Sequence, residues 1–391
     1  MVYGFALAAR LVSTTVLRNK SEKVTSPLVL PGLFILAVLF GGLISVITLA
    51  LLYWLSSRRF GVDREGKHGI SQKDSSRLGG IAIFVSVLLF SVGAPWLSDS
   101  VALLIELNGD EIGTINGYQW LACVIGLVGL ADDTNFGIKP MQRMLLLFAI
   151  SIAGFVWDPE WLPDLHRFSV YSELLTIPLV TIILSAFVLV GFTNASNMVD
   201  GANGLLGIIA TVFFLFVYLL TNEPLYWALV LAISTFILFN MFTGRIFMGD
   251  FGAYTIGALI VLVSYQVFNT EAVSIWLFAS FLSYPCVEIV RVMFLRMFHG
   301  KSPIYSDNNH LHNFLHQFLL VRFKSPLVAN SMTGFLLASL SSILPLVLYL
   351  TELLTISSSL WEWIFAMQAG TFLLLALVFR NRSNLSEYEP I

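Results

Sequence analysis

The chain has 391 residues, of which 57% are hydrophobic and only 12% are charged, and its formal net charge at pH 7 is −3. Soluble globular proteins carry about 25% charged residues, so this composition excludes an ordinary soluble domain and indicates a protein of the lipid bilayer. The two cysteines, Cys123 and Cys286, both lie in apolar segments, and their positions imply neither a disulfide framework nor a zinc site.

Eleven apolar segments are candidates for helices that cross the membrane. A helix needs about 20 residues to cross about 30 Å of hydrocarbon, and the segments 117–131 and 144–157 are shorter than that. The sequence therefore predicts an all-α polytopic membrane bundle of about 11 (10–11) transmembrane helices. In chain order the predicted spans are 31–55, 78–97, 117–131, 144–157, 174–193, 204–221, 225–242, 251–268, 273–295, 328–350 and 358–380.

Lysine and arginine are concentrated in the loops that follow the odd-numbered spans and in the C-terminal tail. The loops that follow the even-numbered spans contain Arg167 as their only basic residue, beside many acids. Because cytoplasmic loops are enriched in lysine and arginine, the odd-numbered loops are predicted to be cytoplasmic. With eleven spans, the N-terminus then lies outside and the C-terminus inside.

The N-terminal segment, 1–30, fits this orientation poorly because its basic residues would lie outside the cell. Its first 17 residues are too short to span the membrane and lack the cleavage site of a signal peptide. We therefore leave 1–30 unassigned, treat 31–380 as a single integral membrane domain, and treat 381–391 as a cytoplasmic tail.

Five polar stretches interrupt the apolar pattern, and all five fall on the predicted cytoplasmic side. Ionisable groups at a membrane edge are costly unless they serve a function, so we expect these stretches to meet in one site. They are SSRLGG (75–80), ADDTNFGIKPMQR (131–143), NASNMVDGANG (194–204), TGRIFMGDFGAY (243–254) and FHGKSPIYSDNNHLHNFLH (298–316).

Four of these stretches also have a purely structural interpretation. Asp132 and Asp133 could end a helix in water, but adjacent acids there oppose the helix dipole, and a divalent cation such as Mg²⁺ would relieve this. The stretch 194–204 is compatible with a polar turn. The pair 249–250 is an ordinary turn signal, although glycine also lets backbone amides approach a phosphate closely.

The histidines, His310 and His312, are compatible with a solvated loop. Their spacing does not match a helical metal pair, and the basic neighbours Arg296, Lys301 and Arg322 favour an anion. Together the five stretches supply carboxylates, amides, glycine turns, histidines and cations. This inventory suits Mg²⁺-assisted phosphate chemistry at the membrane surface, where positioning and charge neutralisation do most of the catalysis, and a lipid phosphate is the substrate that explains a membrane-embedded site.

The motifs SRLGG, ADD, NASNMVDGANGLLG, FMGDFGAY and SPIYSDNNHLHN together resemble the polyprenyl-phosphate N-acetylhexosamine-1-phosphate transferases of glycosyltransferase family 4, in the superfamily of phospho-N-acetylmuramoyl-pentapeptide transferase. The resemblance covers about residues 55–320, with the motifs in family order. It implies transfer of a sugar 1-phosphate from a UDP-N-acetylhexosamine to undecaprenyl phosphate, with Mg²⁺ or Mn²⁺ and release of UMP. It also implies a bacterial cytoplasmic (inner) membrane location with a cytoplasmic active site and no nucleic-acid partner. A homodimer is one option for assembly.

The resemblance implies roles for individual residues. Asp132 and Asp133 match the acidic pair that orients or deprotonates the lipid phosphate, Asp250 matches the metal-binding carboxylate, and Phe247 matches an aromatic that stacks on uracil. Asp133 and Asp200 are further metal candidates. The catalytic candidates are Asp132, Asp133, Arg143, Asp200, His310 and His312, and the substrate-binding candidates are Asn194, Asn197, Asn203, Phe247, Lys73 and Arg77.

The chain departs from the family motifs at Ser76, Asn203, Ala253 and Asn313. The Asn203 form is similar to O-antigen and exopolysaccharide members that use modified UDP-N-acetyl sugars, so we predict GlcNAc-1-phosphate or a modified relative as the transferred group. For Asn203 itself, the alternative is a residue that supports a turn and contacts no ligand. For the whole chain, the alternatives are phospho-N-acetylmuramoyl-pentapeptide transferase, an inactive scaffold of the same fold and a membrane transporter.

Overall fold

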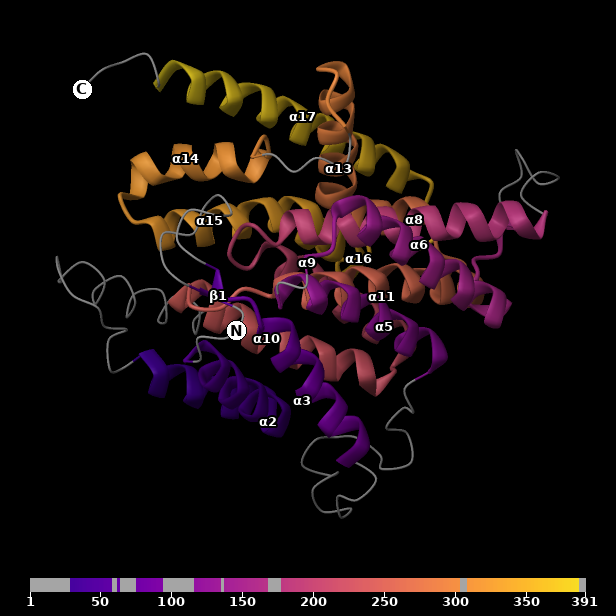
Figure 1. Ribbon diagram of the computed structural model, residues 1–391, viewed down its shortest axis with the longest axis horizontal. Helices are drawn as coiled ribbons and strands as arrows, with labels where there is room; N and C mark the ends of the chain where they lie inside the picture. Colours follow the sequence, from indigo (N-terminus) through magenta and orange to yellow (C-terminus); the bar gives the residue numbers. More distant parts are fainter. Residues whose placement is uncertain are drawn as a thin grey trace.

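The computed structural model describes residues 29–57, 62–63, 75–93, 116–134, 137–167, 177–302 and 308–386, and nearly all of these are helical (Figure 1). The segment 1–28, most of the loop 98–116 and Lys73 lie outside the described residues. The helices are α2 (Val29–Ser56), α3 (Gly79–Gly93), α5 (Gly117–Asp133), α6 (Pro140–Trp157), α8 (Pro178–Val199), α9 (Leu205–Thr221), α10 (Pro224–Thr243), α11 (Gly249–Thr270), α12 (Ile275–Phe281), α13 (Ser283–Phe298), α14 (Leu311–Phe323), α15 (Pro326–Ala338), α16 (Leu344–Leu350) and α17 (Leu360–Ser386).

Short elements complete the described chain. Two single-turn helices, η3 (Pro159–Trp161) and η4 (Leu165–Arg167), follow α6, and a π-helix, η5 (Ser339–Ile343), joins α15 to α16. The strands β1 (Val62–Asp63) and β2 (Ser75–Ser76) form a two-residue antiparallel ribbon. The helix α14 was not among the predicted spans, and it begins within the histidine motif, so that His312 lies in its first turn.

The predicted class, an all-α polytopic membrane protein, is confirmed. Each predicted span coincides with a helix or with consecutive helices. Among the described residues, six helical segments are long and apolar enough to cross a membrane, and the bent pair α12–α13 would make a seventh. The number eleven stays a prediction, because α3, α9 and the part of α2 after Gly42 are apolar but shorter.

Helix α11 lies at the centre of the bundle. It packs against α5, α8 and α3. In its most apolar stretch 72% of the residues are buried, compared with 17% in the corresponding stretches of α6 and α17. Helix α5 approaches it closely at Gly129, where an added Cβ would lie 2.4 Å from the carbonyl oxygen of Asp250. This contact sets the end of α5, with its acidic pair, beside the beginning of α11.

Helix α13 departs sharply from the direction of α12, because the pair α12–α13 is bent by 80°. In Figure 1 it stands upright in the upper part of the molecule, whereas α8, α11 and α15 run roughly horizontally. Backbone groups freed by such a break need partners in a membrane, and η5 supplies them. The hydroxyl of Ser341 accepts a hydrogen bond from the backbone N–H of Tyr284 (3.1 Å), and that of Ser342 donates to the carbonyl of Phe281 (2.7 Å).

Candidate active site

The N-terminus of α11 is the point at which acids from three polar stretches meet. The Asp133 carboxylate accepts hydrogen bonds from the backbone N–H groups of Asp250 (3.1 Å) and Phe251 (2.9 Å), and Asp200 accepts one from Gly249 (3.3 Å). The first N–H groups of a helix have no partner within it, and its dipole favours negative charge there. The turn that opens α11 therefore holds Asp133 and Asp200 next to Asp250.

The stretch 75–80 runs alongside the segment that leads into α11. The N–H of Ser76 donates to the Arg245 carbonyl (3.0 Å), and the Ser76 carbonyl accepts from Phe247 (2.8 Å). This pairing brings Arg77 within 3.9 Å of Asp133, measured from Nη1 to Oδ1. The predicted candidate Arg77 therefore belongs to the acidic cluster, and Phe247 is half-buried in the segment that leads into α11.

Arg143, in the first turns of α6, connects the acidic pair with α11. Its Nη1 donates to Asp132 Oδ2 and lies 3.6 Å from Asp250 Oδ2. Its guanidinium also stands over the ring of Tyr254, 5.7 Å from the centroid. The structure thus places the predicted cation between two of the predicted carboxylates, where it can neutralise charge on a ligand that binds them.

The two histidines lie beside the turn that follows Asp200. An added Cβ on Gly201 would be 2.9 Å from His312 Nε2, and the His310 and His312 rings are stacked with centroids 5.2 Å apart. The Tyr284 hydroxyl accepts a hydrogen bond from the His312 backbone N–H (3.2 Å) and lies 3.0 Å from His312 Nδ1. The histidine stretch therefore meets the asparagine-rich stretch, as expected.

Burial, and to a smaller extent the neighbouring His310, lower the pKa of His312 to about 3. The ring is therefore neutral near pH 7 and can act as a hydrogen-bonding group there. Tyr284 holds its Nδ1, which leaves Nε2 directed toward Gly201. Tyr284 was not among the sequence candidates, because it lies inside a predicted span.

Asn240 is a second residue that the motifs did not indicate. Its Oδ1 accepts a hydrogen bond from the N–H of Gly204 (2.8 Å), and its Nδ2 donates to the Ile246 carbonyl (2.7 Å). The side chain is fully buried at the end of α10. It therefore ties the asparagine-rich stretch to the segment before α11. In the sequence, the indication of this role is a single amide side chain within an apolar helical segment.

The asparagines of the stretch 194–204 have different surroundings. Asn194 donates from Nδ2 to the Val190 carbonyl one turn earlier in α8 (2.8 Å). Asn203 is only 2% exposed; its N–H donates to Asn330 Oδ1 (3.0 Å) and its Nδ2 to Ser331 Oγ (3.4 Å), both on α15. These contacts favour a structural role for Asn203, as a residue that supports the turn, over a role in binding the substrate.

Replacing Asn203 with aspartate is accordingly expected to lower the free energy of unfolding by about 1–3 kcal/mol, since a buried donor is exchanged for a charge. The KM for the UDP-sugar should stay within about twofold, as expected for a residue that makes no ligand contact. Thermal unfolding and KM are measured on the same preparation, with exposed Asn222→Asp as the control. A tenfold change in KM at unchanged stability would restore the nucleotide-binding role.

The carboxylates suit a divalent cation in chemistry, but they do not form a complete cage. Among the described residues, no group of three His, Cys, Asp or Glu side chains could hold a metal ion. Mg²⁺, however, commonly takes one or two carboxylates together with substrate phosphates. Asp200 and Asp250 fit this arrangement better than Asp133, both of whose oxygens accept backbone N–H groups.

Comparison with known proteins agrees with this geometry. Residues 116–268 match the model of glycosyl transferase family 4. The chain is 27% identical to a phospho-N-acetylmuramoyl-pentapeptide-transferase of Dictyoglomus thermophilum over 64% of this chain and 80% of that protein. It is also 27% identical to an undecaprenyl-phosphate alpha-N-acetylglucosaminyl 1-phosphate transferase of Escherichia coli (strain K12), over 50% of this chain and 57% of that protein.

Proposed function

Because residues 116–268 match the model of glycosyl transferase family 4, we propose that the chain is a member of this family and transfers a sugar 1-phosphate from a UDP-linked sugar to a polyprenyl phosphate. The observation that carries the proposal is the meeting of Asp132, Asp200 and Asp250 with Arg143 at the N-terminus of α11. Carboxylates that can hold a divalent cation, together with an arginine, are what binding of a diphosphate requires.

The transferred group is proposed to be GlcNAc-1-phosphate or a modified relative, and the acceptor undecaprenyl phosphate. Support comes from Asn203, whose form resembles members that begin O-antigen or other cell-envelope polysaccharides, and from the stretch SDNNHLHN, which differs from the histidine-rich loop of phospho-N-acetylmuramoyl-pentapeptide transferase. Phospho-N-acetylmuramoyl-pentapeptide is the second candidate, because several relatives carry that activity in their names. The two candidates share one site and differ in the sugar.

The residues of the site divide the work of such a transfer. An oxygen of the lipid phosphate attacks the sugar-proximal phosphorus, the bond to the UMP oxygen breaks, and UMP leaves. Asp132, held by Arg143, orients the attacking phosphate. Arg143 and neutral His312 neutralise or hydrogen-bond the developing charge. A divalent cation held by Asp250 and Asp200 would supply charge neutralisation on the diphosphate.

The test of this proposal is UMP release by purified protein with undecaprenyl phosphate, Mg²⁺ and a panel of UDP-sugars. The panel includes UDP-GlcNAc, its modified relatives and UDP-N-acetylmuramoyl-pentapeptide. Release with UDP-GlcNAc or one of its modified relatives, but not with UDP-N-acetylmuramoyl-pentapeptide, supports the first candidate. Release with UDP-N-acetylmuramoyl-pentapeptide alone supports the second. No release with any of them would contradict the transferase proposal.

The proposed site faces the cytoplasm, where nucleotide sugars are made, and cysteine labelling tests this. Cysteine at Glu160, exposed in η3, should react with a membrane-impermeant thiol reagent added to intact cells, whereas cysteine at Arg322, exposed at the end of α14, should not. The expectation rests on the basic asymmetry between the loops. The parent protein is the control, because Cys123 and Cys286 both lie in helices. The reverse pattern would place the site outside.

A further inference from the structure

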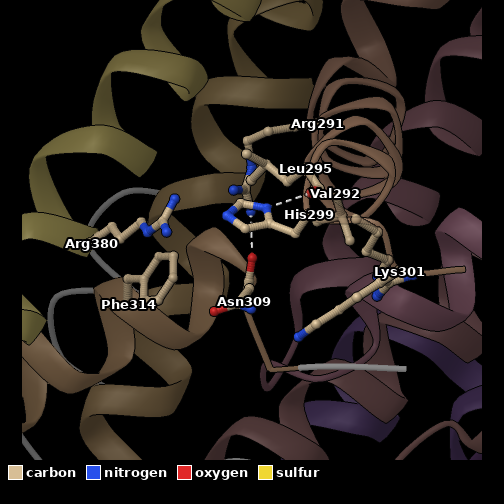
Figure 2. A pocket seen from close by; sticks show the side chains of 9 residues that line it. Arg291, Val292, Leu295, His299, Lys301, Asn309, Phe314 and Arg380 are labelled. Carbon is tan, nitrogen blue, oxygen red and sulfur yellow. Dashed lines mark hydrogen bonds between the residues drawn. The ribbon is translucent and has the colours of Figure 1, made fainter. Parts of the chain in front are cut away.

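A pocket of about 220 Å³ lies between α13, α14 and α17, and none of the acidic residues at α11 lines it (Figure 2). Four of its nine lining residues are lysine or arginine, a fifth is His299, and none is acidic. Figure 2 shows Arg380 and Lys301 on opposite sides with His299 between them. A concave site with this lining attracts a compact anion.

One wall of the pocket is held firmly. Arg291 donates from Nε to Glu288 Oε2 (3.0 Å) and from Nη2 to the carbonyl of Asn309 (2.7 Å). Glu288 also accepts from the N–H of Leu311 (2.9 Å) and lies 3.4 Å from His310 Nδ1. The pocket therefore shares a hydrogen-bond network with His310, and part of the same stretch, 298–316, contributes to its lining.

The outer face of α13 is apolar and exposed. Val290, Phe294 and Phe298 follow one another at four-residue spacing, and their side chains are 64%, 66% and 81% exposed. This spacing places them on one face of the helix, whereas Arg291 and Arg296 line the pocket. A helix with one such apolar face and basic residues on another is typical of a helix that lies in a lipid interface. The 80° bend turns α13 away from the direction of α12.

We propose that this pocket binds the phosphate headgroup of an anionic membrane phospholipid, whose acyl chains pack along the exposed face of α13. Charge complementarity selects the headgroup, since basic clusters beside a membrane helix recognise anionic lipids. The apolar face of α13 selects a lipid over a soluble anion. This lipid is separate from the proposed substrates, and it would hold α13 and α17 together beside the histidine stretch.

The test is direct binding to the full-length protein in zwitterionic nanodiscs, which requires no turnover. Phosphatidylglycerol is titrated and bound lipid is counted by native mass spectrometry, with phosphatidylcholine as the neutral comparison. The variant Arg296→Gln/Arg380→Gln should bind phosphatidylglycerol at least about tenfold more weakly than the parent, because charge near anionic lipid drives such binding. Arg322→Gln/Lys324→Gln removes two exposed charges outside the pocket and should bind like the parent.

Other results would overturn the proposal. Equal binding by the pocket variant and the control variant would remove the pocket as the site. Displacement of phosphatidylglycerol by inorganic phosphate would indicate a soluble anion, and one-for-one displacement by polyprenyl phosphate would assign the pocket to the acceptor. Should the double glutamine variant unfold, Phe294→Asn keeps every cation and should still weaken binding of long-chain phosphatidylglycerol. If the parent protein binds phosphatidylglycerol in the pocket but releases no UMP from any UDP-sugar, only the transferase proposal is contradicted.

Discussion

Replacing Asp250 with asparagine is expected to reduce turnover at least about a thousandfold while the protein stays folded. Asp250 is 7% exposed in the first turn of α11, and its Oδ2 lies 3.6 Å from Arg143 Nη1. Asparagine has nearly the same shape, and the backbone N–H at this position still bonds Asp133. The substitution therefore removes the charge that balances a cation and Arg143, without removing the contact that organises the helix end.

The measurement is UMP release together with thermal unfolding of the purified variant. Glu223→Gln is a matched control, because Glu223 is an exposed acid at the start of α10 and its side chain makes no capping hydrogen bond. The control should keep the activity of the parent. Near-parent, Mg²⁺-dependent activity in Asp250→Asn would show that the Asp250 carboxylate holds no essential cation.

The sequence predicted the class of the fold because hydropathy decides which segments enter the membrane. It did not predict the break between α12 and α13, since a single apolar segment, 273–295, covers both helices. The break depends on Ser341 and Ser342, whose hydroxyls reach it from η5. Such a contact between residues far apart in the chain leaves no periodic pattern to find.

For the site, the sequence predicted the polar stretches better than the roles within them. The acids could be found because charged residues at the ends of spans are conspicuous. That Asp133 caps α11 with both oxygens could not be predicted, because its partners are backbone N–H groups of Asp250 and Phe251. Asn240 and Tyr284 were missed for the related reason that a single polar side chain in an apolar helix does not reveal its distant partner.

Gly249 shows how tightly these stretches approach one another, and its replacement carries the second large expected effect. Its φ is +77°, and an added Cβ would lie 1.8 Å from the carbonyl oxygen of Arg77. A positive φ costs a residue other than glycine about 1–2 kcal/mol, and the clash with backbone adds about 1–3 kcal/mol. Gly249→Ala should therefore lower the free energy of unfolding by about 2–5 kcal/mol.

The same substitution should lower the rate, because Asp250 follows Gly249 directly and a shift of about 1 Å in a catalytic group costs about a hundredfold. Gly137→Ala is the matched control: φ there is +68°, but among the described residues, chain neighbours apart, no atom lies within 4 Å of an added Cβ. Gly137→Ala should lower the free energy of unfolding only by the about 1–2 kcal/mol that a positive φ costs, and it should leave UMP release unchanged. Both variants are compared by thermal unfolding and by UMP release at saturating substrates. If the two alanines cost the same stability and Gly249→Ala stays active, the close approach of Arg77 to α11 is not what holds Asp250 in place.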